Sequence, residues 1–217
     1  MTIEYTFINQ DTALATIVCV TNLYAPHPVQ ACDGSPVAGG DFHYLPWQCL
    51  NASAGAREFF RYEGRLSAVA RQDGATPVLD ASVPTPLIPG RRYLAFPDRR
   101  TLSVAQVGET GGEATAMTAV SLGIEPFALA VDWFLDQSPA GTTSPLAPSQ
   151  AALFCAGDTL LFYPVAPERL PQRLTPAELA SATRYRAPTY ARRVTVTLSQ
   201  PAGGPPVYDF MPPSAAH

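Results

Sequence analysis

The sequence predicts a mainly β protein, a Greek-key β-sandwich with one short helix near residues 176–185. Three observations support this fold class. About ten short apolar runs follow one another at close spacing, as the strands of a sandwich do. Proline occurs 23 times in 217 residues, about twice its usual share of ~5%, and we expect it at turns and strand edges. With 47% hydrophobic and 15% charged residues, the chain has enough apolar side chains for a packed core.

The first two apolar runs are the clearest strands. In residues 2–9, Ile3, Tyr5 and Phe7 alternate with other residues and share one face. Residues 15–20 are apolar on both faces, which predicts a central strand that is buried on both sides. The other expected strands lie at 57–62, 65–71, 76–82, 92–96, 101–107, 115–122, 151–155, 158–165 and 192–200.

The helix expected over 176–185 begins with a capping box. Thr175 stands at the N-cap, Pro176 at the first helical position and Glu178 three residues after the cap. Residues 126–136 allow two interpretations. Their apolar residues alternate as in a strand, which we favour, but the segment is also apolar enough for a buried helix that begins at Pro126. Residues 136–150 are polar and rich in proline, which predicts a long loop.

One heptapeptide matches a known structural device. The sequence LIPGRRY (87–93) fits the pattern Leu-x-Pro-Gly-x-x-Tyr and resembles the tyrosine corner of fibronectin-type and immunoglobulin-like sandwiches. In those folds the tyrosine hydroxyl bonds back to the backbone where the chain crosses between sheets. The resemblance implies that Tyr93 opens a strand of a Greek-key sandwich, immunoglobulin-like or jelly-roll-like, and it brings no functional residue with it.

The length of the chain suits a single domain over 1–217. The alternative is two smaller β domains over 1–108 and 113–217, divided at the polar segment GETGGE. The N-terminus has no basic region before its apolar run, so we expect no signal peptide. The apolar runs are too short for a transmembrane helix. We therefore expect a soluble chain, either cytoplasmic or exported by a non-classical route.

All 14 basic residues are arginine, and the net charge is −4. Because nucleic-acid binding depends on clustered positive charge, this balance argues against a nucleic-acid partner. The absence of lysine is typical of arginine-biased codon usage. Selection against lysine, as in a secreted effector or toxin that avoids ubiquitin attachment, is the alternative explanation.

Residues 25–49 hold the best candidates for metal ligands. Asp41 and His43 would lie on the same side of an extended strand, and His27 precedes them in the same proline-rich segment. Two imidazoles and a carboxylate would suit Zn²⁺ or Fe²⁺ with one open coordination position. However, the familiar metal-binding spacings are missing, and His27 stands between two prolines that favour an exposed loop. We expect no cofactor; the alternative is one divalent transition metal.

The four cysteines predict structural roles. Cys19 and Cys155 lie in apolar strands, where thiols behave as small buried hydrophobic groups. Cys32 and Cys49 flank a loop that a disulfide would close. Because the sequence carries no secretory signal, we expect reduced thiols instead.

Aromatic residues near arginines form the candidate binding surface. Its members are Tyr44, Trp47, Tyr185, Arg186 and Tyr190. Aromatic rings and guanidinium groups are enriched in protein interfaces and on sugar-stacking surfaces. The alternative is that these aromatic rings close the end of a sandwich core.

Together these observations favour a non-enzymatic binding or self-assembling structural protein, whose partner is another protein or a second copy of itself. A carbohydrate ligand is also compatible with the aromatic residues. The main alternative is a small metal-dependent enzyme that uses His27, Asp41 and His43. A second alternative is a lysine-free secreted effector or toxin.

Overall fold

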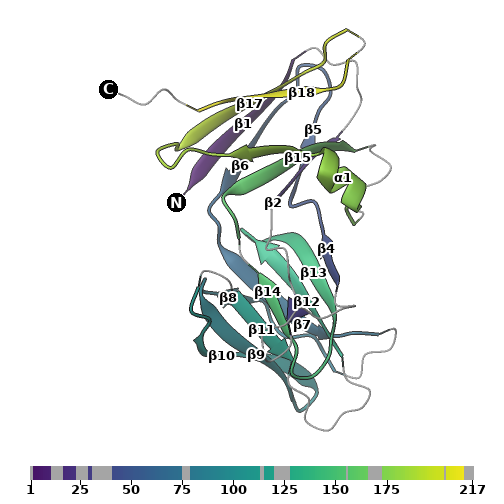
Figure 1. The fold of residues 1–217 in the computed structure, drawn as a ribbon, viewed down its shortest axis with the longest axis vertical. Helices are drawn as coiled ribbons and strands as arrows, with labels where there is room; N and C mark the ends of the chain where they lie inside the picture. Colours follow the sequence, from purple (N-terminus) through teal and green to yellow (C-terminus); the bar gives the residue numbers. More distant parts are fainter. Residues whose placement is uncertain are drawn as a thin grey trace. The chain divides into compact units, whose positions relative to one another are not determined.

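The computed structural model describes residues 2–10, 17–22, 29–30, 41–74, 79–112, 115–119, 128–154, 156–165, 173–202 and 204–212. Over these residues the chain is mainly β, with several sheets and one short helix, as the sequence predicts (Figure 1). Contacts divide the chain into two compact units. Unit 1 comprises Met1–Leu23, Leu45–Gly64 and Gly157–His217, and unit 2 comprises Tyr24–Tyr44 and Arg65–Ala156. The expected domain boundaries concern independent folding and stay predictions.

Unit 1 contains two four-stranded sheets. The first sheet has the order β18 (Val207–Met211), β17 (Arg193–Ser199), β1 (Ile3–Gln10) and β6 (Arg57–Tyr62). The second has the order β16 (Thr183–Arg186), β15 (Thr159–Val165), β2 (Ile17–Asn22) and β5 (Gln48–Asn51). β1 confirms the predicted alternation, because Ile3, Tyr5 and Phe7 are all buried. It pairs in parallel with β17, which lies near the other end of the chain.

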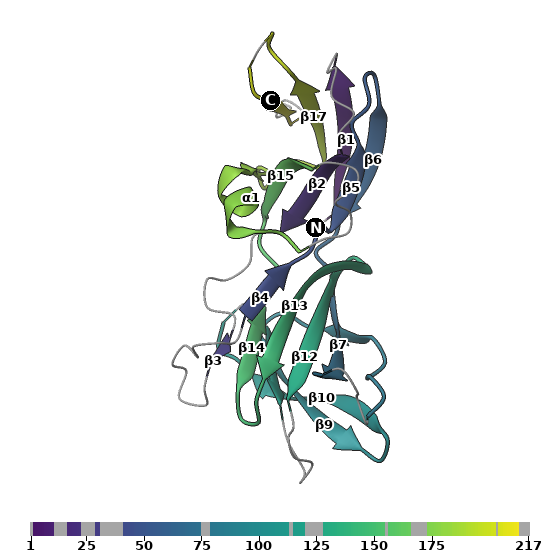
Figure 2. The same cartoon turned by 90° about the vertical axis from the view of Figure 1, so that its right-hand side faces the viewer.

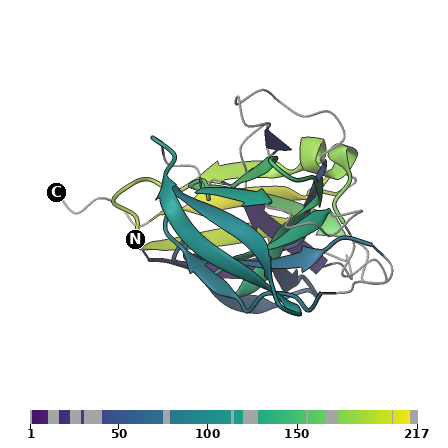
Figure 3. The ribbon, with the colours of Figure 1, turned by 90° about the horizontal axis from the view of Figure 1, so that it is seen from below.

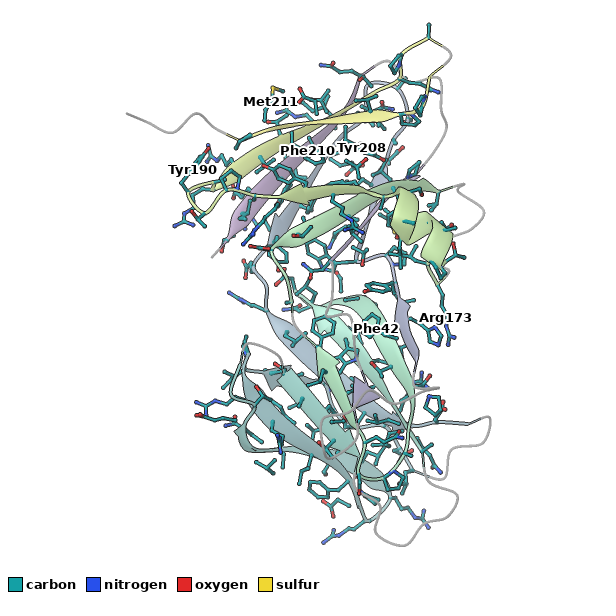
Figure 4. The ribbon with its side chains drawn as sticks, viewed as in Figure 1. Phe42, Arg173, Tyr190, Tyr208, Phe210 and Met211 are labelled. Atoms are coloured by element: carbon teal, nitrogen blue, oxygen red, sulfur yellow. The ribbon has the colours of Figure 1, made fainter. Side chains whose placement is uncertain are left out.

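Aromatic side chains from both sheets of unit 1 meet in its core. Phe162 of β15 lies 6.5 Å from Phe60 of β6 and 5.2 Å from Phe210 of β18, measured between ring centroids. Figure 4 shows Tyr208 and Phe210 on the side of β18 that faces β15, and Met211 on the opposite side. The alternation of β18 therefore separates the core face of this sheet from an exposed face.

β2 is buried on both faces, as the sequence predicts. Val18 and Val20 lie on the core side, and Cys19 lies on the opposite side in a separate apolar cluster. That cluster consists of Cys19, Leu161, Tyr163, Val165 and Ala182, with Leu174 and Leu179 packed against it. Leu179 belongs to the helix α1 (Pro176–Ser181), and Leu174 lies just before it. The helix thus covers the outer face of β2 and β15.

The predicted capping box of α1 is confirmed. The Glu178 backbone N–H donates to Thr175 Oγ1 at 3.2 Å, and the Thr175 N–H donates to Glu178 Oε2 at 2.8 Å. The helix ends at Ser181, so its expected extension to residue 185 is wrong. Residues 183–186 instead form β16, which pairs with β15, and the Tyr185 ring stacks on Phe210 at 4.2 Å. This packing overrides the local helix preference.

Unit 2 contains two five-stranded sheets (Figure 2). The first has the order β10 (Thr101–Glu109), β9 (Arg91–Asp98), β11 (Thr115–Ala119), β14 (Ala151–Phe154) and β3 (Val29–Gln30). The second has the order β4 (Asp41–Tyr44), β13 (Ser138–Leu146), β12 (Leu129–Leu135), β7 (Leu66–Gln72) and β8 (Thr85–Leu87). Trp133 of β12 stacks on Phe154 of β14 at 5.0 Å, which joins the two sheets. The antiparallel pair of β9 and β10 is drawn in teal in Figure 3.

Two uncertain segments of unit 2 are strands. The favoured interpretation of 126–136 is confirmed over Leu129–Leu135, whereas 126–127 lie outside the described residues. The long loop expected over 136–150 is wrong, because Ser138–Leu146 forms β13 between β12 and β4. Its two register irregularities lie near Pro139 and Pro145, where a missing N–H does least harm to the ladder. Its threonines are satisfied in place; Thr143 Oγ1 accepts from Trp133 Nε1 at 2.9 Å.

One expected strand is reduced in the structure. Of the segment 76–82, the described part forms only an isolated bridge between Asp80 and Thr101. Within the described ranges, no helix has the length and apolar character needed to cross a membrane.

Candidate functional site

An exposed sheet face in unit 1 combines aromatic, apolar and charged side chains. We call it the Phe59 face. It belongs to the β18-β17-β1-β6 sheet and consists of Glu4, Thr6, Ile8, Arg57, Phe59, Arg61, Arg193, Thr195, Thr197, Asp209 and Met211, of which Thr197 is buried. Because side chains alternate along a strand, these residues lie opposite the core residues Tyr5, Phe60, Val194 and Phe210.

The strand register arranges the Phe59 face in rows across the sheet. One row is formed by Phe59, Thr6, Thr195 and Met211, in the order of the strands β6, β1, β17 and β18. A second row is formed by Arg57, Ile8, Thr197 and Asp209. A third is formed by Arg61, Glu4 and Arg193. Because neighbouring strands lie about 4.8 Å apart, a row across four strands spans about 14 Å.

The apolar members of this face are unusually exposed for their size. Phe59 is 67% exposed to solvent, and Met211 is 51% exposed. They lie at opposite edges of the sheet, one on β6 and the other on β18. A hollow of about 690 Å³ is lined by residues of β1, β6 and β17, namely Glu4, Tyr5, Thr6, Phe59, Phe60, Arg61 and Arg193. Large exposed apolar groups next to a hollow are typical of binding surfaces.

Charges surround the exposed ring. Glu4 accepts from Arg61 at 3.1 Å and from Arg193 at 3.3 Å, so one carboxylate bridges two guanidinium groups. The guanidinium of Arg57 lies 5.3 Å from the centroid of the Phe59 ring, within cation–π range. Asp209 has no ion-pair partner among the described residues. The face therefore carries an available carboxylate at one edge and an arginine–aromatic pair at the other.

The tyrosine beneath this face is a core residue. Tyr5 is buried and stacks on Phe60 at 4.7 Å. Burial raises the pKa of Tyr5 well above its ordinary value, and nearby Tyr185 and Tyr62 raise it further. The phenol therefore stays protonated over the physiological range and does not supply a base to the hollow. The chemical groups on this face are an aromatic ring, a methionine thioether and charged side chains, which suit the recognition of a partner.

The residues predicted as metal ligands are only partly described. His27 lies outside the described residues, as does the side chain of Asp41. Asp41 and His43 both belong to β4. Among the described residues, no group of three or more His, Cys, Asp or Glu side chains is placed to hold a metal ion. The three-ligand site stays a prediction.

His43 of β4 lies at one end of a polar row in unit 2. It is opposite Thr142 of β13, which is opposite Asp132 of β12. Asp132 accepts from Thr142 Oγ1 at 2.7 Å and from Arg71 Nε at 2.8 Å. Because the carboxylate is occupied by an arginine and a hydroxyl, we assign this row a structural role.

Two of the aromatic residues predicted for binding serve the core. Trp47 is only 3% exposed, and its indole packs edge-on against Phe60 and Tyr62 at 5.8 and 5.6 Å. Tyr185 stacks on Phe210 and is half-buried. Both rings pack in the core of unit 1, and their part in binding stays a prediction.

The other predicted binding residues differ in exposure. Tyr44 belongs to unit 2, where it is half-buried and contacts Phe42 edge-to-face at 4.9 Å. Arg186 is exposed and pairs with Asp158 at 2.6 Å. Tyr190 is 55% exposed in the turn before β17 (Figure 4). Binding by these three residues stays a prediction.

The sequence contains a signal for the Phe59 face that residue type alone does not reveal. In REFFRY (57–62), two adjacent phenylalanines are followed by a tyrosine two positions after the second. In a strand, Phe60 and Tyr62 share the buried face, so Phe59 must point the other way with Arg57 and Arg61.

Comparisons with protein-family models, curated proteins and solved structures found no match for this chain.

Proposed function

We propose that the chain is a non-enzymatic structural protein that binds a second copy of itself through the Phe59 face. The observation that carries this proposal is the self-complementarity of the face. Its exposed apolar side chains and its unlike charges stand in the same rows at opposite edges of one sheet. Two copies related by a two-fold axis can therefore satisfy both edges at once.

Consider a two-fold axis in the plane between the copies and parallel to the strands. It turns the second sheet over, so that β6 of one copy lies against β18 of the other. In matched rows, Phe59 then meets Met211 of the second copy, and Arg57 meets Asp209 of the second copy. The strands of the two sheets stay roughly aligned, which is the common way for sheets to pack face to face.

The central strands support the same arrangement. The axis places β1 against β17 of the second copy, so Glu4 faces Arg193 of the second copy. These two residues already form an ion pair within one chain at 3.3 Å. In the pair of copies each carboxylate lies among arginines from both chains, and like charges do not meet. Complementary charges of this kind fix the register of an interface more than they add affinity.

Electrostatics favours this axis over the other in-plane axis. A two-fold axis perpendicular to the strands would place β6 against β6 of the second copy. If this axis ran along the Phe59 row, Arg57 of one copy would face Arg61 of the other. Like charges opposed in an interface are costly. We therefore expect the axis parallel to the strands.

The fold supports a structural role as well. We infer that each unit is a Greek-key β-sandwich, because each has two sheets joined by aromatic contacts and strand orders that skip along the chain. Such sandwiches present rigid, flat sheet faces. A rigid face loses little conformational entropy when it binds, which suits repeated assembly.

A charge exchange tests the proposal. Sedimentation velocity over the micromolar concentration range should show concentration-dependent association of the unmodified chain. Arg57→Asp and Asp209→Arg alone should each weaken association about tenfold or more, because each leaves like charges opposed. The double variant Arg57→Asp/Asp209→Arg should recover most of the lost association, since the pair is restored with reversed sign.

Three results would overturn the proposal. The first is a strict monomer throughout that concentration range. The second is association that neither single variant weakens. The third is a double variant as weak as the product of the two single effects, which would mean that the residues do not meet. Arg99→Asp, in the exposed turn between β9 and β10 of unit 2, is a matched control that should leave association unchanged.

A further inference from the structure

Two cysteines of unit 1 stand directly opposite each other on neighbouring strands. Cys19 of β2 pairs in register with Cys49 of β5, and their sulfur atoms lie 3.9 Å apart. Residues opposite each other in an antiparallel pair have Cα atoms about 4.5–5.5 Å apart, which is within the range that a disulfide spans. Both thiols are free in this structure. Closing the bond therefore requires side-chain rotation and little movement of the backbone.

We propose that Cys19 and Cys49 form a redox modification site that closes to an intramolecular disulfide on reaction with a low-molecular-weight disulfide. The proposal stands on the pairing of the two strands and is independent of the self-association proposed above. It differs from the sequence analysis, which favours reduced thiols and offers a Cys32–Cys49 disulfide as the alternative; Cys32 lies outside the residues that the structure describes.

The two thiols are placed for different steps of this reaction. Cys49 is exposed, whereas Cys19 is buried beneath α1 among Leu161, Tyr163 and Leu179. A hydrogen bond from the Cys19 thiol lowers the pKa of Cys49, although burial opposes this effect. The same contact and burial raise the pKa of Cys19. Cys49 is therefore the accessible thiolate and Cys19 the resolving thiol.

The reaction needs no reactant other than the two protein thiols and the small disulfide. The Cys49 thiolate attacks one sulfur of the small disulfide, forms a mixed disulfide and releases one small thiolate. Cys19 then loses its proton to that thiolate or to water, and its sulfur attacks the Cys49 sulfur. The second small thiolate leaves and is protonated. The two protein thiols are oxidised by two electrons, and the small disulfide is reduced to two thiols.

The bond would close a specific loop of the chain. Between the two cysteines the chain leaves unit 1 after Leu23, contributes Tyr24–Tyr44 to unit 2 and returns to unit 1 at Leu45. β5 is also the edge strand of its sheet, held by β2 alone among the described strands. The disulfide would therefore tie an edge strand to a central one and fix both ends of this excursion.

The test uses a variant that retains only the pair, Cys32→Ser/Cys155→Ser, beside the unmodified chain. Both are incubated with oxidised glutathione under native conditions, and the remaining thiols are alkylated and mapped by mass spectrometry. We expect a cross-linked peptide pair that contains Cys19 and Cys49, with both residues protected from alkylation. The oxidised form should unfold about 5 °C or more above the reduced form, and adding dithiothreitol should reverse the shift.

The outcomes are distinct. A stable glutathione adduct on Cys49 with an alkylatable Cys19 would overturn the proposal, and so would a Cys49–Cys32 bond in the unmodified chain. If the double variant does not fold, peptide mapping of the unmodified chain decides the question alone. Cys49→Ser is the control: Cys49 is exposed, so the fold should persist, whereas oxidation should no longer raise the unfolding temperature.

Discussion

The hydroxyl of Tyr93 accepts a hydrogen bond from the backbone N–H of Ile88, five residues earlier, at 2.8 Å. Tyr93 is only 3% exposed and lies near the start of β9. The Ile88 carbonyl in turn accepts from Thr115 Oγ1 of β11 at 3.3 Å. The segment 87–93 thus closes back on itself as the tyrosine corner that its sequence resembles. The resemblance is confirmed as local geometry.

The corner predicts a measurable loss of stability for Tyr93→Phe. The substitution keeps the ring but leaves the Ile88 N–H without its partner in a partly buried turn. We expect the free energy of unfolding to fall by about 1–3 kcal/mol, measured by urea denaturation. Tyr190→Phe is the matched control, because Tyr190 is 55% exposed and should change stability little. Equal effects of the two variants would contradict the assigned role of the corner.

Gly90 in the same turn should tolerate no side chain. Its φ is +77°, and a Cβ there would lie 2.6 Å from the Gly112 carbonyl oxygen. Gly90→Ala therefore combines an unfavourable backbone conformation with a backbone clash, and we expect a loss of roughly 1–3 kcal/mol in urea unfolding. Gly108→Ala, with open space around its Cβ and no positive φ, should cost much less. A smaller loss for Gly90→Ala than for Gly108→Ala would refute this explanation.

The sequence predicts most strands because local alternation reports burial directly. Ile3, Tyr5 and Phe7 are buried as expected, and the capping box of α1 forms as its residues require. β13 could not be predicted in this way. Its burial depends on two neighbouring strands, and its threonines are satisfied by Trp133 and Asp132, which only the fold brings near. Polar composition alone therefore indicated a loop.

The candidate site is less predictable than the fold because residue type does not reveal which face of a strand is covered. Trp47 is of a residue type that is common in binding surfaces, yet it packs against Phe60 and Tyr62 in the core. Phe59 is of a residue type that is common in protein cores, yet it is exposed. Likewise, the partnership of Cys19 with Cys49 depends on the register of β2 and β5, which no local pattern in either strand specifies.

Asn22 should be among the most sensitive polar residues of unit 1. It is fully buried at the end of β2, donates to the Gly157 carbonyl at 2.7 Å and accepts from the Gly157 N–H at 2.8 Å. These bonds join the first and last chain segments of unit 1. Asn22→Ala leaves both backbone groups without this partner, so we expect a loss of about 2–4 kcal/mol in urea unfolding.

The control for Asn22 is Asn51→Ala. Asn51 is exposed at the end of β5 and, among the residues that the structure describes, accepts only from the local Ser53 N–H, at 2.9 Å. Its loss should cost well under half as much as the loss of Asn22. If the two asparagine variants unfold at the same urea concentration, the bonds to Gly157 do not hold the segments together.

Phe59→Ser should separate assembly from stability. Because Phe59 is 67% exposed, its truncation should change the free energy of unfolding by no more than about 0.5 kcal/mol. The same variant should weaken self-association about tenfold or more, because a large aromatic ring buried against Met211 of the second copy contributes strongly to an interface. Val107→Ser, at a 50% exposed position in unit 2, should leave association unchanged. Equal association of both variants in sedimentation velocity would exclude Phe59 from the interface.

The reactivity of the Cys49 thiol should depend on pH. The hydrogen bond from Cys19 favours the charged form of the Cys49 sulfur and lowers its pKa. The rate of alkylation by iodoacetamide should therefore rise with pH around a midpoint below the ordinary cysteine value of about 8.5. Cys19→Ala removes the donor, so the midpoint should move upward, while the small buried side chain is replaced with little change in packing. An unchanged midpoint in that variant would show that Cys19 does not tune Cys49.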